Sequence, residues 1–444
     1  MTTTIDTLTR LLQVLESDLA RRTTRELYYK GEQPLAFLAP EARLAIGSRF
    51  GRIATNLCRV TVNALAERLR VTGFSGPDLG TLWDDWKAND LDQMVGLAHR
   101  EALALGEAYV IVWADKQGRP LVTVESPSQV AVQRDPATRE VIRAVKRWEA
   151  SDATYAVLYE PDRITKWKAQ PGAIAAGFSL VETLPNPLGV VPVVPLRNSD
   201  RLMGPAMSEI DDIAPLVDAL NKTLADMLVS SEYAGRPRRW GTGIELVEDE
   251  VLDEHGNPTG ETVAVNPYPE QNRMMLNENP DAKFGALPAA DLGGYEASVR
   301  VLQAQICAVS GLPPHYLGAH GDQPASADAL RAAEASLVAK AEARQAVFGR
   351  AWEQVARLMV AVRTGLAPAS IFAVVQWADP ATRSVAQEAD AVVKLYSAGL
   401  LPATYALKKL GYSDDEVDQI RAARRAETLD GSGANLDSLL GGAR

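Results

Sequence analysis

The sequence contains very little cysteine. Cys58 and Cys307 are the only two among its 444 residues, and each lies inside an apolar helical pattern. Paired cysteines are typical of oxidising compartments and small secreted domains. We therefore expect two reduced, packed thiols and no disulfide.

Long hydrophobic runs are missing as well. The longest runs, such as AYVIVWA at Ala108 to Ala114, are far shorter than the roughly 20 apolar residues that a membrane-spanning helix needs. The first residues, MTTTIDTLTR, lack the basic-then-apolar order of a signal peptide. These absences predict a chain that lies in a cytoplasm and has no membrane partner.

Short motifs of the common enzyme classes are also absent. No Gly-Lys pair occurs, so there is no GxxxxGK[ST] loop to hold the phosphates of a nucleotide, and HExxH, CxxC and GxSxG are missing. Three carboxylate pairs lie near predicted helix starts, where negative charge is favourable, and we interpret all three as structural: Asp84-Asp85, Asp211-Asp212 and Asp414-Asp415. The sequence predicts no catalytic residue, no metal site and no cofactor.

Positive charge is in deficit. The chain has 46 Lys and Arg against 57 Asp and Glu, a formal net charge of -11. Tight nucleic-acid binding depends on cations that neutralise phosphates and release counterions, so this balance disfavours a protein that grips DNA. A protein that contacts DNA without holding it is not disfavoured.

The first 200 residues predict one α+β domain. Apolar residues recur at steps of three and four from Ile5 to Leu19 and from Leu91 to Leu105, which predicts helices with one buried face. NLCRVTVNALAERLRVTGF predicts a helix that stops at Gly73. From Glu107 to Asn198 the segments are short, rich in Val, Ile, Tyr and Trp, and separated by turn residues, which indicates an antiparallel sheet.

A β-rich excursion separates two long predicted helices. The first runs over Ile210 to Ser231, with a capping-box pattern at SEID and with Pro215 forcing a start near Asp212 or a bend. The polar stretch from Gly235 to Ala290 contains the basic-aromatic cluster RPRRW and the acidic run ELVEDEVLDE, which we interpret as a solvated strand edge or loop. The second helix, with a face from Tyr295 to Val309, ends at Gly311.

The loop that follows this helix is rich in reactive residue types. SGLPPHYLGAHGDQPAS contains His315, His320 and Asp322, which could serve as metal ligands, and Ser326, which could serve as a nucleophile. No positioned third group supports either chemistry, and the alternative interpretation is that Ser326 caps the next helix, with Asp328 in its first turn. That helix is predicted over Ser326 to Thr364, with a seam from Val338 to Val362.

The last 80 residues are predicted to be helical. SDDE at Ser413 to Glu416 fits a capping box for a helix that reaches about Glu427. The tail from Thr428, rich in Gly and Ser, is predicted to be disordered.

Four quoted stretches carry a family resemblance. They are YYKGEQPL, NLCRVTVNALAERLRVTGF, SEIDDIAPLVDALNKTLADMLVSSEYAGRPRRWGTG and the Ala-rich stretch PASADALRAAEASLVAKAEARQAVFGRAWEQVARLM that follows GLPPHYLG. Together, in this order from Tyr28 to Tyr412, they resemble the portal proteins of tailed double-stranded-DNA bacteriophages, of the long-tailed type found in actinobacteriophages. The motifs include no catalytic signature, so the resemblance depends on the residues that the stretches contain and on their order along the chain.

The resemblance implies a portal fold within the α+β class. It implies a wing over residues 1–205, a first stem helix over 206–234, a clip over 235–290, a second stem helix over 291–310, a tunnel loop over 311–325, a long helix over 326–365, C-terminal wing and crown helices over 366–427, and a disordered tail over 428–444.

The same resemblance implies a ring of about twelve copies at one capsid vertex, through which viral DNA is packaged and ejected. The implied partners are DNA, the large terminase, a head-tail adaptor, the major capsid protein and a scaffold protein, and the implied location is the virion after assembly in the host cytoplasm. The candidate DNA-facing residues are His315, Tyr316, His320, Asp322 and Gln323. The candidate partner-binding residues of the clip are Arg236, Arg238, Arg239, Trp240, Glu248, Asp249 and Glu250.

Two other functions remain open from the sequence. A DNA-packaging enzyme subunit is disfavoured by the missing phosphate-binding loop. Another capsid or adaptor protein would be shorter and would not need two long helices around a polar insertion.

Overall fold

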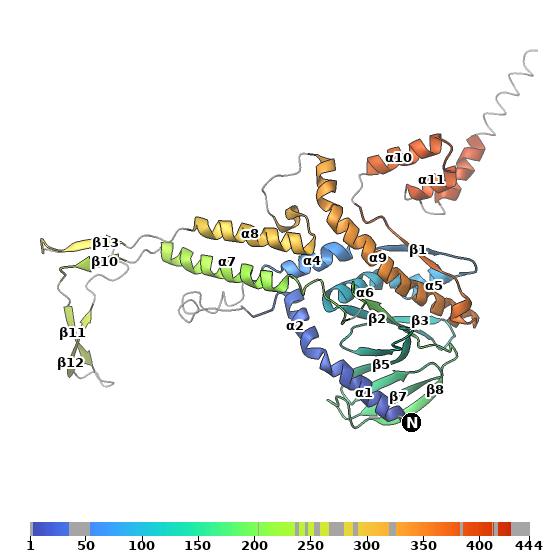
Figure 1. Cartoon of the computed structure of the whole chain (residues 1–444), viewed down its shortest axis with the longest axis horizontal. Helices are drawn as coiled ribbons and strands as arrows, with labels where there is room; N and C mark the ends of the chain where they lie inside the picture. The colour runs from blue at the N-terminus through green and yellow to red at the C-terminus, as the bar shows by residue number, and fades with distance from the viewer. Residues whose placement is uncertain are drawn as a thin grey trace, which may run out of the picture. The chain divides into compact units, whose positions relative to one another are not determined.

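The computed structural model of the chain describes residues 3–34, 54–202, 204–235, 239–244, 247–252, 258–265, 279–286, 292–318, 326–381, 385–410, 412 and 416–427. The chain divides into two compact units, residues 1–380 and 381–444. Figure 1 labels their helices and strands.

In the described part of the first unit, these helices precede strand β2: α1 (Thr4–Ser17), α2 (Leu19–Lys30), α4 (Leu57–Ala66), α5 (Leu82–Ala88) and α6 (Leu91–Leu105). A capping box opens α1, because the Thr3 side chain accepts a hydrogen bond from the backbone of Asp6 and the Asp6 carboxylate accepts one from the backbone of Thr3. Leu8, Leu12 and Leu15 then recur on one buried face.

Two antiparallel sheets form the centre of this unit. The smaller has the order β3 (Pro120–Glu125), β2 (Glu107–Ala114), β9 (Val193–Arg197). The larger runs in chain order through β4 (Val130–Arg134), β5 (Val141–Glu149), β6 (Thr154–Tyr159), β7 (Arg163–Ala169) and β8 (Ser179–Pro185). The buried face of α1 packs on the larger sheet, in a cluster with Val145, Leu158 and Trp167.

Strand β2 is buried on both faces. Val110 and Val112 point into the cluster formed with the helices, whereas Tyr109 and Ile111 pack with β4, β5 and β9 residues in a second cluster. Since successive side chains of a strand point to opposite faces, burial on both sides explains why this strand is a continuous apolar run.

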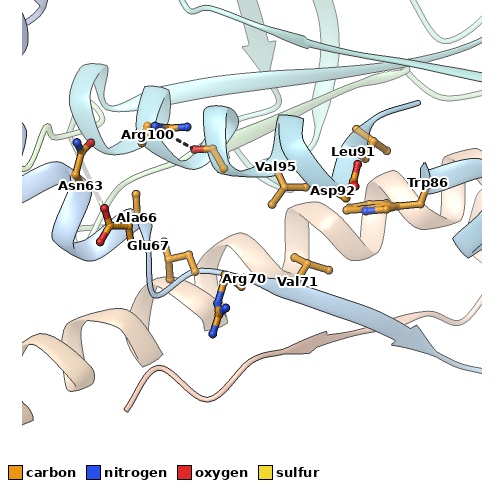
Figure 2. Close-up of a pocket in the computed structure, with 12 residues that line it drawn as sticks. Asn63, Ala66, Glu67, Arg70, Val71, Trp86, Leu91, Asp92, Val95 and Arg100 are labelled. Atoms are coloured by element: carbon orange, nitrogen blue, oxygen red, sulfur yellow. Dashed lines mark hydrogen bonds between the residues drawn. The ribbon is translucent and has the colours of Figure 1, made fainter. Parts of the chain in front are cut away.

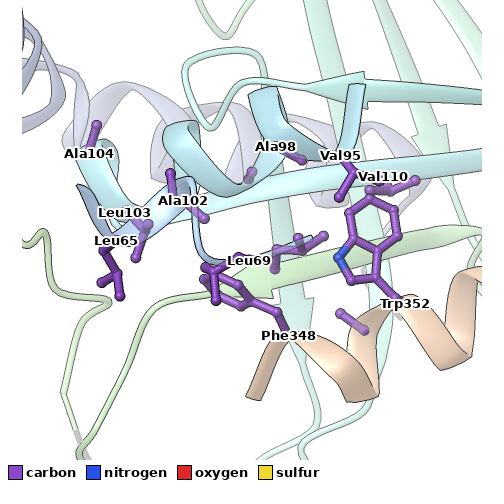
Figure 3. Packing of buried hydrophobic residues seen from close by; sticks show 14 of the residues in the cluster. Leu65, Leu69, Val95, Ala98, Ala102, Leu103, Ala104, Val110, Phe348 and Trp352 are labelled. Carbon is purple, nitrogen blue, oxygen red and sulfur yellow. The ribbon is translucent and has the colours of Figure 1, made fainter. Parts of the chain in front are cut away.

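The long helix α9 (Ala327–Thr364) completes the main core. Phe348 and Trp352 from α9 lie near Leu69, Val95 and Val110 in Figure 3 and belong to the same buried cluster. The strand β14 (Val374–Trp377), which follows α9, pairs antiparallel with β1 (Val71–Ser75). Residues separated by about 280 positions thus share one core.

A buried histidine fixes the contact between α6 and α9. His99 is fully buried, its Nε2 accepts a hydrogen bond of 2.8 Å from the Trp352 indole, and its Nδ1 lies 3.0 Å from the Leu69 carbonyl. This pattern requires the neutral tautomer with the proton on Nδ1. Burial lowers the pKa of His99 from 6.5 to about 3, although the Leu69 carbonyl acts in the opposite direction.

Helices α7 (Ala214–Gly235) and α8 (Gly293–Ser310) lie side by side, as Figure 1 shows. The described part of the chain between α7 and α8 forms two antiparallel strand pairs: β10 (Arg239–Thr242) with β13 (Lys283–Ala286), and β11 (Val247–Leu252) with β12 (Pro258–Val265). Burial concentrates in the part of α7 from Val217 to Ala225 and in the last turn of α8.

The second unit contains α10 (Val385–Ser397), α11 (Ala403–Lys409) and a helix over 416–427. Val392, Ala406 and Val417 are buried within it. The helix predicted to reach Glu427 is confirmed, whereas its capping residues 413–415 and the tail from 428 lie outside the described residues.

Several local predictions are confirmed. The α+β class is confirmed by the helices and antiparallel sheets, and Cys58 and Cys307 are buried free thiols. The first long helix begins at Ala214, which places Pro215 in its first turn, where a missing backbone N–H costs nothing.

Other local predictions are wrong. The helix predicted to stop at Gly73 ends at Ala66, because Val71–Ser75 pairs with β14 and its β-branched residues suit a strand. Ile5 and Val309, which were predicted to lie on buried helix faces, are exposed. On α9, the buried apolar face begins at Leu337 and not at Val338. Periodicity alone does not show where a buried face begins or ends.

We expect the stability of this unit to depend on pH through His99. Its pKa is about 3 in the folded chain and 6.5 ordinarily, so between these values the unfolded chain binds the extra proton. The free energy of unfolding therefore falls as pH drops below 6.5, by at most about 1.4 kcal/mol per pH unit. Denaturant titrations at pH 7.5, 6.5 and 5.5 measure this slope.

The matched variant is His99→Gln, which does not titrate. It is expected to be less stable at pH 7.5, because the glutamine amide cannot meet the Trp352 indole and the Leu69 carbonyl as the imidazole does. Its free energy of unfolding should depend less on pH between 6.5 and 5.5. Equal slopes for the two proteins would contradict a neutral, buried His99.

Candidate functional site

The loop between α8 and α9 is held at both described ends. Gly311 ends α8 in the left-handed conformation at φ 74°, and the 3-10 helix η2 (Pro314–Leu317) follows at once. At the other end, the Ser326 side chain accepts a hydrogen bond of 3.2 Å from the Ala329 backbone and caps α9. The interpretation of Ser326 as a helix cap is therefore confirmed.

Lys340 joins three elements at the base of this loop. Its Nζ donates a 2.8 Å hydrogen bond to the Ser310 carbonyl, at the end of α8, and lies 3.4 Å from Glu209 Oε2, just before α7. Arg344, one turn further along α9, lies 2.9 Å from Glu209 Oε1. One pair of cations on α9 thus holds the near ends of both α7 and α8.

The Glu209 side chain at this junction is 8% exposed. Burial is the strongest single influence and raises its pKa, but the charges of Lys340 and Arg344 together with hydrogen bonds from Arg344 and Asn198 outweigh burial and hold the pKa below the ordinary value. A buried carboxylate with two cationic partners is costly to leave unpaired.

A second set of contacts fixes η2 itself. Arg68, between α4 and β1, donates a 3.1 Å hydrogen bond to the Tyr316 hydroxyl and lies 3.3 Å from Glu334 of α9. The same buried Glu334 carboxylate lies 3.8 Å from His315 Nε2. His315 and Tyr316 are therefore fixed at the root of the loop.

The strand pairs between α7 and α8 expose apolar and acidic groups. Trp240 stands opposite Gly285 in the β10–β13 pair, and a Cβ at Gly285 would lie 2.6 Å from the indole ring, so this strand position needs glycine. Trp240 is 45% exposed and Phe284 is 37% exposed, while Asp249 lies exposed on β11. Exposed aromatic side chains on a short sheet can anchor a protein partner.

The remaining candidate residues of the clip and of the loop differ in whether the structure describes them. Arg239 lies in β10 beside Trp240, and Glu248 and Glu250 flank Asp249 in β11. Arg236, Arg238, His320, Asp322 and Gln323 lie outside the described residues.

One groove of about 390 Å³ is lined by α4, the start of β1, and α6, with Glu67, Arg70 and Asp92 among its lining residues, as Figure 2 shows. Among the residues that the structure describes, no group of three or more His, Cys, Asp and Glu side chains could hold a metal ion. None of the described helices is both long enough and apolar enough to span a bilayer.

Sequence reasoning missed the residues at the base of the loop. Glu209 and Lys340 are 131 positions apart, and Arg68 and Tyr316 are 248 apart, so no local pattern connects them. Gly311 and Ser326 carry local signals, which is why the ends of the flanking helices could be predicted.

Comparison with known proteins gives a consistent result. Residues 13–428 match the family model described as phage portal protein, SPP1 Gp6-like. The chain is 33% identical over 396 residues to the portal protein of Mycobacterium phage D29, and 32% identical over 398 residues to that of Mycobacterium phage L5. Each match covers 84% of this chain and 79% of the relative.

Solved structures are more distant. A chain in the virion of a native gene transfer agent particle matches with a TM-score of 0.46 at 14% identity, covering 88% of this chain and 99% of that one. A chain in the neck of the same kind of particle, computed with C12 symmetry, matches with the same TM-score, identity and coverage.

We expect Glu209→Gln to destabilise the chain by about 3 kcal/mol, because it leaves the charges of Lys340 and Arg344 without their buried partner. Lys340→Met is expected to cost less, since Glu209 keeps Arg344. Denaturant unfolding of the purified proteins measures both changes.

The matched control is Glu296→Gln, which breaks an exposed pair with Arg300 on α8. It should cost less than about 0.5 kcal/mol. If Glu209→Gln behaved like this control, the junction would not be held by the buried charge.

Proposed function

Because the chain belongs to the SPP1 Gp6-like family of phage portal proteins, we propose that its segments form the wing, stem, clip, tunnel loop and crown that the resemblance implies. A portal protein forms the DNA channel at one vertex of the phage head and is a structural component of the virion, not an enzyme. The expectations of a portal function and of a non-enzymatic role are confirmed by this membership.

The finer layout of the fold is part of the proposal. The two sheets with α1, α2, α4, α5 and α6 form the wing, together with the long helix α9. Helices α7 and α8 form the stem, residues 235–290 with their strand pairs form the clip, and residues 366–427 form the C-terminal wing and crown. The observation that supports this layout is the junction at Lys340, which ties both stem helices to α9 at one end and leaves the strand pairs at the other.

We propose a ring of about twelve copies. Contacts between unlike faces of neighbouring copies close into a ring when the rotation per copy is right. Helix α9 is rich in Ala, which allows close approach of neighbouring helices. Twelve copies of a chain with net charge -11 carry roughly -130, a field that opposes DNA adhering to the ring.

The segment 311–325, between the end of α8 and the Ser326 cap of α9, is proposed as the tunnel loop. Its ends are fixed by the Arg68–Tyr316 hydrogen bond and by the Ser326 cap, so the segment between them is held at a defined root. Histidine and polar Gln323 side chains give weak contacts to a DNA backbone, whereas a ring of arginines would hold it tightly. Weak contact lets the DNA slide.

The clip is proposed to bind the large terminase during packaging and the head-tail adaptor afterwards. Its exposed Trp240 and Phe284 supply apolar anchors, and the acidic β11 strand supplies charge that selects a partner. The major capsid protein and a scaffold protein are the remaining proposed partners, at the capsid vertex.

Negative-stain images of the purified chain are expected to show rings with a central hole. Trp240→Ala is expected to leave these rings intact and to weaken binding of the adaptor or the terminase at least tenfold, because interface aromatic anchors carry about 2 kcal/mol or more. Surface plasmon resonance on assembled rings measures the affinity.

Phe372→Ala is the matched control, since Phe372 is 61% exposed and follows η3 (Pro368–Ser370), outside the clip. It should leave both affinities unchanged. A compact monomer in the images would count against the portal ring, whereas intact rings whose Trp240→Ala form binds normally would reject only the clip assignment.

Replacing His315 and His320 together with Ala is expected to change the amount of DNA packaged or retained per head, measured by nuclease-protected DNA in particles. His315→Ala alone separates the root of the loop from its tip. Unchanged packaging and retention in the double variant would reject a role for these histidines at the channel.

A further inference from the structure

The helices of the second unit, α10, α11 and the helix over 416–427, border an apolar groove of about 420 Å³. Its lining includes the buried side chains of Val392 and Ala406 and the half-buried side chains of Leu407 and Ile420. The volume lies within the range of roughly 300–1,000 Å³ that is usual for binding sites. The groove is therefore large enough to receive several side chains.

The rim of this groove is exposed and mostly apolar. Val393 is 56% exposed, and Tyr396 and Leu410 are exposed as well. Arg424 and Glu427 are the charged lining residues. An apolar patch with polar residues at its border is typical of a surface that another segment covers, because large apolar side chains are unfavourable in water.

The chain continues directly from the rim of the groove. Glu427 ends the helix over 416–427 and is itself a lining residue. Residues 428–444 follow it in the sequence. A segment that is tethered at the rim meets the groove at a high effective concentration, in the roughly millimolar range for a short flexible linker. A separate partner would have to reach this concentration in solution.

This following segment contains an apolar stretch with helical spacing. Leu436, Leu439 and Leu440 occupy positions i, i+3 and i+4, so they would share one face of a helix. Asn435 is a favoured N-cap residue, and the two glycines that follow Leu440 are typical of a helix end. A helix this short is not stable by itself in water. The stretch therefore needs a surface on which to fold.

The linker in front of the leucines is long enough to reach the groove. It comprises residues 428–435, and a flexible chain of this length spans about 16 Å. Ile420 lies about 10 Å back along the helix from Glu427, at a rise of 1.5 Å per residue. The groove wall that this helix forms thus lies within reach of residues 436–440.

We propose that residues 436–440 form a short helix that occupies this groove in the same chain, with its three leucines against Val393, Leu407 and Ile420. Recognition of a helix in a groove uses apolar anchors at this spacing. The tether at Glu427 favours the chain's own segment over any other occupant.

The charges on the two sides are complementary. In such a helix Asp437 is rotated by about 100° from Leu436, which places it at the border of the leucine face. Arg424 lies on the rim, where its guanidinium is 3.4 Å from the Tyr396 hydroxyl. An exposed pair between Asp437 and Arg424 would add little affinity, but it would set the direction in which the helix lies.

The docked segment would act as a cap on its own unit. While it occupies the groove, the apolar surface is closed to other copies and to partners, and a partner with a better-fitting helix has to displace it. The predicted disorder of the tail would then be confined to the linker, residues 428–435. This role does not depend on the portal function.

Thiol labelling of the full-length chain tests the proposal. The cysteine introduced by Val393→Cys should react with a maleimide at least about fivefold more slowly in the otherwise unchanged chain than after Leu439→Asp and Leu440→Asp, because the docked segment covers it. The native Cys58 and Cys307 are buried, so the parent chain gives a slow background rate.

Leu400→Cys is the matched control, because Leu400 is 70% exposed in the same unit and does not line the groove. Its labelling rate should be the same with and without the two tail substitutions. Equal rates for Val393→Cys in the two backgrounds would overturn the proposal.

A cysteine pair identifies the chain that supplies the helix. Ala423→Cys on the groove is combined with Gly441→Cys beside the leucines, and the protein is oxidised. The expected disulfide lies within one chain and yields a monomer with two fewer free thiols on a non-reducing gel. A covalent dimer, formed with the tail of another copy, or the absence of a disulfide would overturn the proposal. Neither measurement bears on whether the chain forms a portal ring.

Discussion

The ion pair between Glu209, whose side chain is 8% exposed, and the half-buried Lys340 is the contact on which the arrangement of the long helices depends. Lys340 has one carboxylate partner before α7 and one carbonyl partner at the end of α8, so a single ammonium group sets where two helices meet a third. An apolar contact could supply equal stability, but it would not fix the ends of three helices so narrowly, because hydrophobic burial is not directional. Arg344 makes the carboxylate strongly paired and therefore costly to disturb.

Around this junction, the two sheets and the helices packed on them provide a rigid base. Strand β2 is packed against helices on one face and against the second sheet on the other, and the α6–α9 contact contains a histidine that serves as a neutral hydrogen-bonding group. Such interiors are close-packed and transmit strain with little local yielding. Helices α7 and α8 are thus attached to a body that does not deform easily.

Much of the fold could be predicted from the sequence because local chemistry determines it. Helix ends follow from local backbone chemistry at Gly311, Ser326 and Pro215. The apolar β2 segment is typical of a strand that is buried on both faces. The boundary at Gly73 was predicted wrongly because β14, which pairs with this segment, lies about 300 residues away. The contacts of Arg68, Glu209 and Lys340 were unpredictable for the same reason: each joins positions that only the folded chain brings together.

The anchoring of α8 also has a mechanical consequence. At 1.5 Å per residue, its 18 residues make a rod of about 27 Å, held at its last turn and joined to the strand pairs at its first. Because α7 packs alongside α8, with Ser230 Oγ 2.9 Å from the Tyr295 hydroxyl, the two helices bend together, and a transverse load at their far end produces the largest bending moment at the clamp. The Ser310 carbonyl, its Lys340 donor and the glycine that follows therefore occupy the point where a load applied at the strand pairs is felt most strongly, next to the root of the loop.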